Sequence, residues 1–122
     1  MATLELIQRC VHQGFALDIG CGKNPYIFRD AVENYVGLDI DIETLMEVSR
    51  DIPSANLICA SGSKVPFRND AFGMVICTET LEHLEKPEET ISEISRLLIK
   101  GGFAVISVPS LSSANTDSMV CF

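Results

Sequence analysis

The chain has 122 residues, and 47% of them are hydrophobic. This length supports one compact domain with a hydrophobic core and is too short for two. Nine Lys and Arg residues are outnumbered by 17 Asp and Glu residues, so the formal net charge is -8. An acidic protein repels a phosphate backbone, so we expect no nucleic-acid substrate unless a partner chain supplies a basic surface.

Two further features concern the cellular compartment. Residues 1–14 lack the basic segment and long apolar run of a secretory signal peptide, and no stretch of about 18 apolar residues predicts a membrane span. The five cysteines are an odd number, and no two of them have the C-x-x-C spacing of metal or redox sites. We therefore expect a cytoplasmic protein with reduced thiols and no membrane contact.

Apolar runs alternate with helix-like segments from Phe15 onward, a pattern typical of βαβ units with a buried parallel sheet. Strands are predicted over residues 15–19, 35–39, 55–60, 72–78 and 102–108, and helices over 25–33, 41–50 and 87–100. The buried helix faces are expected to contain Ile42, Leu45 and Met46 in the second helix and Ile91, Ile94, Leu97 and Leu98 in the third. One domain over residues 1–109 and an irregular, Ser- and Asn-containing tail over 110–122 follow from this pattern.

A glycine-rich turn follows the first predicted strand. Gly20 and Gly22 permit a tight turn between the strand and a helix, where free backbone N–H groups suit an anionic or carboxylate-bearing ligand. Asp39 lies about 20 residues after Asp18, at the end of the second strand, where an acid can accept hydrogen bonds from both hydroxyls of a ribose. Together, the turn and the acid predict a nucleoside-binding site.

The residues around this turn favour one class of nucleoside ligand. A dinucleotide fingerprint would have a third glycine three positions after Gly22, where this chain has Pro25. Asp18 would repel a pyrophosphate but would attract an amino group. S-adenosylmethionine carries an ammonium and a sulfonium and no phosphate, so it fits Asp18 better than a dinucleotide does.

Two segments resemble the first two motifs of the class I S-adenosylmethionine-dependent methyltransferases. They are Leu17-Asp-Ile-Gly-Cys-Gly22 and Gly37-Leu-Asp-Ile40. Residues 65–67, 71–76, 81–84 and 97–102 resemble later segments of the small-molecule branch of this family, so the resemblance covers residues 15–109. It implies an α/β fold with a Rossmann-like, doubly wound, mainly parallel sheet in the strand order 3-2-1-4-5.

The resemblance also implies how the chain binds S-adenosylmethionine. Asp18 would hold the methionine ammonium, the glycine turn would pass under the cofactor, Asp39 would bind the ribose, and Ile40 would pack on the adenine. Ser61 replaces an Asp that is usual in the family, and its hydroxyl can still accept a hydrogen bond from the adenine amino group. The full set of expected cofactor-binding residues is Asp18, Gly20, Cys21, Gly22, Asp39, Ile40, Ser61 and Thr78.

The chain departs from the family fold in its length. That fold continues after the fifth strand with a helix and two antiparallel strands, whereas only 13 residues follow Pro109 here. We therefore expect the last two strands to be missing and the fifth strand to form an open edge. Natural proteins cover or pair such an edge, so we expect the tail, a second copy or a partner protein to close it.

Glu79, Glu82 and His83 form an E-x-x-E-H cluster after the fourth predicted strand. The spacing resembles a metal-binding motif of some O-methyltransferases, and two carboxylates and an imidazole can hold a divalent ion. A polar helix start explains the same residues without a metal, and we favour it because no second nearby histidine is assured. His83 is also a candidate general base, since an imidazole titrates near neutral pH.

These observations predict an enzyme that transfers the sulfonium methyl group to an O, N or C nucleophile of a small molecule in one in-line displacement. Such a transfer depends mainly on alignment of the reactants, so no firm catalytic residue is assigned. The alternative is a non-catalytic cofactor-binding or regulatory module that needs a partner chain to complete the fold. A truncated product of a longer gene is a third interpretation, and the sequence does not identify the methyl acceptor.

Overall fold

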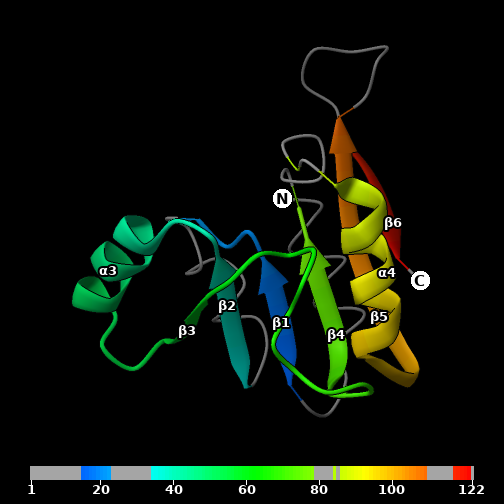
Figure 1. Ribbon diagram of the computed structural model, residues 1–122, viewed down its shortest axis with the longest axis horizontal. Coiled ribbons are helices and arrows are strands. Elements are labelled where there is room, and N and C mark those ends of the chain that lie inside the picture. Colours follow the sequence, from blue (N-terminus) through cyan, green and yellow to red (C-terminus); the bar gives the residue numbers. More distant parts are fainter. Residues whose placement is uncertain (1–14, 23–33, 79–83, 85, 110–116, 122) are drawn as a thin grey trace.

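The computed structural model describes residues 15–22, 34–78, 84, 86–109 and 117–121. The described residues form six strands in one sheet, accompanied by two helices (Figure 1). The strands are β1 (Ala16–Ile19), β2 (Tyr35–Asp39), β3 (Asn56–Cys59), β4 (Phe72–Cys77), β5 (Leu98–Pro109) and β6 (Asp117–Cys121). The helices are α3 (Ile42–Asp51) and α4 (Pro87–Leu97).

The sheet has the order β3-β2-β1-β4-β5-β6. The pairs among β1 to β5 are all parallel, so the predicted order 3-2-1-4-5 is confirmed. β1 and β4 lie in the middle of the sheet and are buried along their whole length. Strands that are covered on both faces are continuously apolar, which is why they are easy to find in the sequence.

The outermost strand corrects the expectation for the C-terminal tail. Asp117–Cys121 pairs antiparallel with β5, in a register that sets Ile106 opposite Val120. The prediction of an irregular tail over residues 110–122 is therefore wrong for residues 117–121. The β5 edge is paired by the tail of the chain itself, which is one of the three ways in which we expected this edge to be closed. Unpaired N–H and C=O groups of an edge strand favour any segment that can reach them, even one without apolar alternation.

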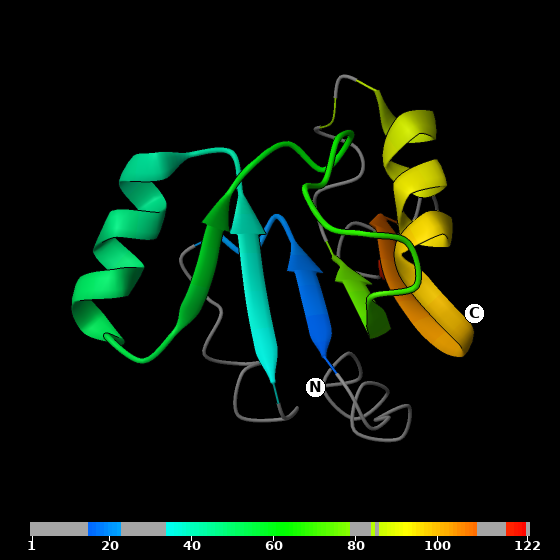
Figure 2. The same ribbon diagram turned by 60° about the horizontal axis from the view of Figure 1, so that its bottom comes forward.

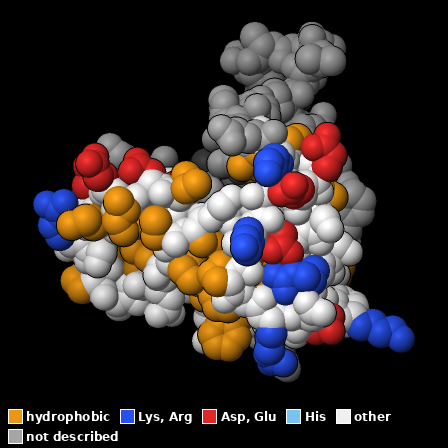
Figure 3. Space-filling view, viewed as in Figure 1, with side chains coloured by type: hydrophobic (Ala, Val, Ile, Leu, Met, Phe, Trp, Pro, Cys, Tyr) orange, Lys and Arg blue, Asp and Glu red, His pale blue; other side chains and the backbone are white. Residues whose placement is uncertain are grey.

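α3 follows its capping residue Asp41 and packs against β2 and β3 at one end of the sheet. Its buried face contains Leu45 and Val48. Ile42 and Met46 were also predicted to be buried, but they are 53% and 55% exposed. Hydrophobic side chains accordingly gather on the surface over α3 (Figure 3). Because α3 lies at the edge strand, only part of its apolar surface finds a neighbouring strand to cover it.

α4 begins with Pro87, at a position where the missing N–H group costs no helical hydrogen bond. It ends at Leu97, and Leu98 already has an extended backbone, so the prediction of a helix up to residue 100 is too long. β5 starts there, with an irregularity in its pairing with β4 where Gly101 has a φ of +84°. A second difference is Ile91, which was predicted to be buried and is 47% exposed.

The hydrophobic core lies between the sheet and α4, and the loop between β3 and β4 contributes to it. Figure 2 shows this loop passing from β3 toward α4 before the chain enters β4. Val65 of the loop belongs to the core cluster, and Phe67 packs against it. The rings of Phe67 and Phe72 meet edge to face, with their centroids 5.0 Å apart. The loop is therefore held by the same apolar contacts that join the sheet to α4.

Two expectations about helices remain. The helix predicted over residues 25–33 lies outside the described residues. In the described part of the chain, no helix combines the length and apolar character that crossing a membrane requires.

Candidate cofactor site

A pocket of about 210 Å³ opens at the carboxyl ends of β1, β2 and β3. This edge of an open parallel sheet is where such folds bind ligands. The pocket is lined by Ile19, Gly20, Leu38, Asp39, Ile40, Ala60, Ser61, Gly62 and Leu84. Four of the predicted cofactor-binding residues, Gly20, Asp39, Ile40 and Ser61, therefore lie around one cavity.

The glycine turn after β1 is held against the end of β2. Gly20 and Gly22 have φ values of +73° and +58°, which residues with a side chain rarely adopt. The N–H groups of Gly20 and Cys21 both donate to the carbonyl of Leu38, at 2.7 and 3.0 Å. The two glycines thus form a tight turn with a fixed position beside the pocket.

Asp39 joins two loops at the pocket wall. Its Oδ2 accepts a hydrogen bond from the Gly22 N–H at 2.9 Å, and its Oδ1 accepts one from the Asp41 N–H at 2.9 Å. A carboxylate oxygen has two lone pairs, so each oxygen can accept one further hydrogen bond. Asp39 can therefore hold both loops and accept two ribose hydroxyls at the same time.

Asp18 lies beneath the turn and is not among the residues that line the pocket. It is 2% exposed, and its Oδ2 accepts a 2.5 Å hydrogen bond from the Tyr35 hydroxyl. Burial raises the pKa of the Asp18 carboxyl to about 7, against the lowering effect of the Tyr35 hydrogen bond and with a further rise from the charge of Asp39. The contact of Asp18 with a methionine ammonium stays a prediction.

Tyr35 was not predicted as part of the site. In the parallel register of β1 and β2 it pairs with Ala16, two residues before Asp18. Alternate residues of a strand share one face of the sheet, which lets the two side chains meet. Burial and the charge of Asp18 raise the pKa of Tyr35 above its usual range, so the phenol remains a hydrogen-bond donor. Only the strand register reveals this partner, and no local sequence pattern encodes it.

Cys21 is a packing residue of the turn. It is 8% exposed, and a Cβ added at Gly37 would lie 3.0 Å from the Cys21 Sγ. Burial raises the pKa of the thiol to about 12, and the charges of Asp18 and Asp39 add to the rise. A protonated thiol is a poor nucleophile, so Cys21 contributes shape to the turn and no chemistry.

Ser61 and Gly62 form the part of the pocket wall that follows β3. The Ser61 hydroxyl accepts a hydrogen bond from the Ser63 N–H at 3.2 Å, and its Oγ lies 2.8 Å from the Ser63 Oγ. Gly62 packs so closely on β1 that an added Cβ would lie 2.8 Å from the Cγ2 atom of Ile19. Gly62 was not predicted, because the need for glycine comes from a contact with another strand and not from a turn signal.

The remaining predicted residues follow β4. Thr78 comes directly after this strand and is not among the residues that line the pocket. Glu79, Glu82 and His83 lie outside the described residues, so their metal-binding and base roles stay predictions. Within the residues that are described, no group of three His, Cys, Asp or Glu side chains is placed to hold a metal ion.

Known proteins share this combination of fold and motifs. Residues 17–106 match the model of the family described as "Methyltransferase domain". The chain belongs to this methyltransferase family. The resemblance to class I methyltransferases, stated on the basis of short motifs, is thereby confirmed, and S-adenosylmethionine is the cofactor.

Two curated relatives cover most of this methyltransferase domain. A protein of Mycolicibacterium smegmatis named "Probable S-adenosylmethionine-dependent methyltransferase" is 26% identical over 108 residues, which are 87% of this chain and 42% of the relative. The tRNA (carboxymethyluridine(34)-5-O)-methyltransferase of Saccharomyces cerevisiae is 32% identical over 94 residues, 74% of this chain and 33% of the relative. The chain therefore spans less than half the length of these relatives.

A solved structure has the same fold as the methyltransferase domain. It is a chain in the complex between the Haloferax volcanii Trm112 methyltransferase activator and a methyltransferase. The TM-score is 0.75 at 21% identity, and the match covers 87% of this chain and 51% of that chain. At this identity the likeness supports the Rossmann-like sheet and nothing about substrates.

The pocket of the methyltransferase domain suits the chemistry of its cofactor. Asp39 keeps acceptor capacity for two further hydrogen bonds, and Ser61, which follows β3, also lines the pocket. Ile40 lines the pocket and is nevertheless 73% exposed. The roles of these three side chains toward a ribose and an adenine stay predictions.

Proposed function

We propose that this chain binds S-adenosylmethionine in the pocket at the carboxyl ends of β1, β2 and β3, as the cofactor-binding part of an enzyme that methylates a small molecule. The Asp39 carboxylate supports the proposal most directly, because each of its oxygens lies at the pocket with acceptor capacity left. None of the described lining residues is basic, so the pocket offers a dinucleotide no cation for its pyrophosphate.

Each residue of the wall has its own task in this proposal. Asp39 accepts hydrogen bonds from the ribose hydroxyls, Ile40 packs on the adenine, and Ser61 accepts a hydrogen bond from the adenine amino group. Gly20 allows the ligand to approach the backbone closely. The bound cofactor supplies a methyl group on a positively charged sulfur. The protein holds and orients this group, since an in-line transfer depends on alignment more than on acid or base groups.

Isothermal titration with S-adenosylhomocysteine tests the role of Asp39. We expect a micromolar Kd for the wild type, about -8 kcal/mol. Asp39→Asn is expected to weaken binding by roughly 10- to 100-fold, because hydrogen bonds to a charged group contribute about 1.5–3 kcal/mol. The variant keeps the size of the side chain but sets an NH2 group against one of the two backbone N–H groups that Asp39 holds, so the loss combines the missing charge with one missing loop contact.

Glu43→Gln is the matched control for this titration. It removes an exposed carboxylate of α3, outside the pocket lining, and is expected to leave the affinity unchanged. NAD is expected not to bind. A folded wild-type chain that binds no adenosyl ligand would contradict the proposal, and binding that survives Asp39→Asn would contradict the role given to this carboxylate.

A tRNA nucleoside is a second candidate acceptor, favoured by the yeast relative whose name specifies tRNA. The net charge of -8 opposes RNA binding by this chain alone, so a partner would have to supply a basic surface. A structure of the same fold, solved in complex with a methyltransferase activator, makes a partner of this kind reasonable. A non-catalytic module is less favoured, because the chain belongs to an enzyme family.

Radiolabelled S-adenosylmethionine distinguishes the two acceptors. Label that enters a small-molecule extract in the presence of this chain supports the first proposal. Label that enters tRNA, and does so only when a basic partner protein is added, supports the second. The Asp39→Asn variant, assayed in parallel, shows whether the transfer depends on the pocket.

A further inference from the structure

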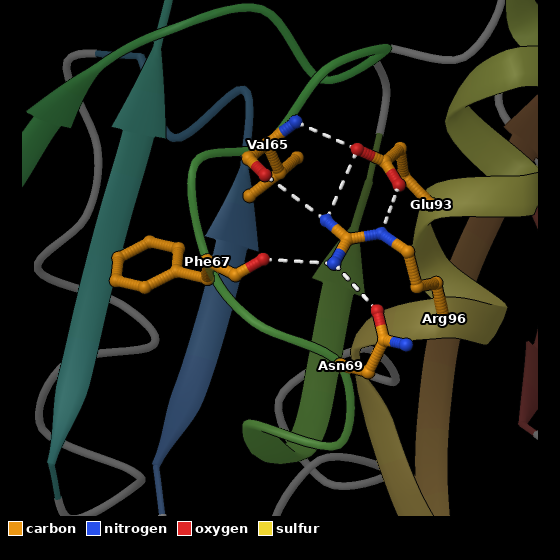
Figure 4. A network of polar contacts seen from close by, with 5 residues as sticks. All are labelled: Val65, Phe67, Asn69, Glu93 and Arg96. Carbon is orange, nitrogen blue, oxygen red and sulfur yellow. Dashed lines mark hydrogen bonds and ion pairs between the residues drawn. The ribbon is translucent and has the colours of Figure 1, made fainter.

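Arg96 of α4 holds the loop between β3 and β4 with its whole guanidinium group (Figure 4). Its Nη1 donates to the Phe67 carbonyl at 2.8 Å and to the Asn69 Oδ1 at 3.0 Å. Its Nη2 donates to the Val65 carbonyl at 3.0 Å. The Glu93 carboxylate accepts the other two hydrogen bonds, from Nε at 2.5 Å and from Nη2 at 3.2 Å. All five N–H groups of the guanidinium are therefore used.

Glu93 completes the contact from the same helix. Its Oε1 accepts a hydrogen bond from the Val65 N–H at 2.8 Å, so Val65 is held through both its N–H and its carbonyl. The Glu93 and Arg96 side chains are 15% and 30% exposed, which removes much of the competition from water. The hydrogen bond from Arg96 lowers the pKa of Glu93, so the carboxylate stays charged at neutral pH.

The segment held in this way follows directly after the pocket wall. Ser61 and Gly62 line the pocket, and the Lys64 N–H donates to the Ser61 carbonyl at 3.2 Å, which closes a tight turn. The next residue is Val65. At the other end of the wall, the Ala60 N–H donates to the last carbonyl of β2 at 3.0 Å. The wall is thus a short turn between two points with fixed backbone positions.

We propose that Glu93 and Arg96 are positioning residues of the cofactor site: by fixing Val65 they set where Ser61 and Gly62 stand, and thereby how well the pocket distinguishes adenine from other bases. The inference rests on the proposed function, because it takes Ser61 to be the group that meets the base. Glu93 and Arg96 are not among the described lining residues, so both act through the loop.

The geometry requires arginine rather than any cation at this position. A planar guanidinium can point to two carbonyls, an amide oxygen and a carboxylate at once, whereas lysine offers a single nitrogen. Arg96→Lys therefore keeps the charge and loses most of the loop contacts. Glu93→Gln keeps an acceptor for the Val65 N–H and is expected to have a milder effect than Glu93→Ala.

The test compares the affinities of S-adenosylhomocysteine and S-inosylhomocysteine, in which a carbonyl replaces the adenine amino group. The wild type is expected to prefer the adenine ligand by about tenfold, because a Ser61 hydroxyl that meets the inosine carbonyl has to turn its hydrogen away from the Ser63 Oγ and toward the ligand. Arg96→Lys is expected to reduce this preference to about threefold or less, because the single nitrogen of lysine cannot donate to Val65, Phe67 and Asn69 at the same time. Glu93→Gln is expected to retain most of it. If Arg96→Lys does not fold, Glu93→Ala takes its place.

Arg50→Lys is the matched control, because Arg50 donates to the Met46 carbonyl within α3 and is not among the residues that line the pocket. It is expected to leave the base preference unchanged. If Arg96 only stabilised the fold, the variant would bind both ligands more weakly by the same factor, and the ratio of the two affinities would stay unchanged. An unchanged ratio in Arg96→Lys, or equal affinities in the wild type, would overturn the inference.

Hydrogen exchange gives a second readout that needs no cofactor. The Ser63 and Lys64 amides, which donate to the Ser61 hydroxyl and carbonyl, are expected to exchange at least about tenfold faster in Arg96→Lys, while those of β1 keep their rates. If the wild type binds neither ligand, the proposed function fails by that result. The exchange rates of these two amides then decide the positioning role, and unchanged rates would refute it.

Discussion

Asp18 and Tyr35 form a buried polar pair beneath the glycine turn. Burial removes the hydration of a carboxylate, so the protonated form of Asp18 is favoured in the folded chain and its pKa rises to about 7. In the unfolded chain the same group titrates near about 3.9. Between these two values the folded state holds a proton that the unfolded state has lost. The contribution of Asp18 to the free energy of unfolding therefore falls as the pH rises through this window.

Asp18→Asn is expected to remove this pH dependence while keeping an acceptor for the Tyr35 hydroxyl. Relative to the wild type, the variant should gain stability between about pH 4 and pH 7, by on the order of 2–4 kcal/mol, and show no further gain above that range. Urea unfolding at a series of pH values measures the difference. If the free energies of unfolding of the variant and the wild type differed by the same amount at pH 4 and pH 8, the raised pKa assigned to Asp18 would be contradicted.

Tyr35→Phe provides a second check on the same pair. The variant removes the hydrogen bond that lowers the pKa of Asp18, so the upper end of the pH window should move to higher pH. The fold of β2 is expected to persist, because only one oxygen atom is lost.

Gly62 illustrates how one missing side chain shapes the pocket wall. Gly62→Ala would place a Cβ 2.8 Å from the Cγ2 of Ile19, in a strand that is buried along its length. We expect the loop to shift rather than the strand, with a loss of about 1–3 kcal/mol in stability and a weaker affinity for S-adenosylhomocysteine. Chemical denaturation and isothermal titration measure the two effects.

Gly101→Ala is the control for this substitution. Gly101 also resists a side chain, but only through its φ of +84°, since no atom lies within 4 Å of the added Cβ. It lies in β5 and outside the pocket lining. A cost of about 1 kcal/mol with unchanged cofactor affinity is expected. Equal losses of affinity in both alanine variants would show that the effect of Gly62→Ala is not local.

At the scale of elements, the strands agree with expectation more closely than the helices do. The apolar runs of β1 and β4 could be recognised because both faces of these strands are buried. The buried side of α3 could be recognised only in part: Leu45 is buried as predicted, whereas Ile42 and Met46 are exposed. Periodicity shows that a helix has an apolar stripe but not how much of it the edge of the sheet will cover. β6 contains Met119, Val120 and Cys121 but lacks the alternation of apolar and polar residues that is typical of a strand, and its formation depends on the free edge of β5.

Removal of residues 110–122 is expected to expose the β5 edge and cause self-association. Without the partner strand, the N–H and C=O groups that pair with Asp117–Cys121 would be free to pair with another chain. Analytical ultracentrifugation over a range of concentrations compares the shortened chain with the full one. A shortened chain that stays monomeric and equally stable would show that β6 contributes little.

At the scale of the whole molecule, the order of the sheet brings the site together. β1 lies between β2 and β4, and β3 follows β2, so the glycine turn, Asp39 and Ser61 meet at one edge although they are distant in the chain. α4 comes after β4 in the chain, yet its Glu93 and Arg96 side chains anchor the loop between β3 and β4, which contains Ser61. The pocket is thus a property of the complete sheet with its helix.

The sequence by itself determined the parallel strands, the glycine turn and the acid at the end of β2, and its motifs indicated the strand order. These features depend on apolar periodicity, on glycine's access to positive φ and on residue types at strand ends, all of which are local. Only the tertiary structure decided the pairing of Tyr35 with Asp18 and the anchoring of Val65 by Arg96. These contacts depend on strand register and on which helix face is buried, and both are set by packing between segments that are distant in the chain.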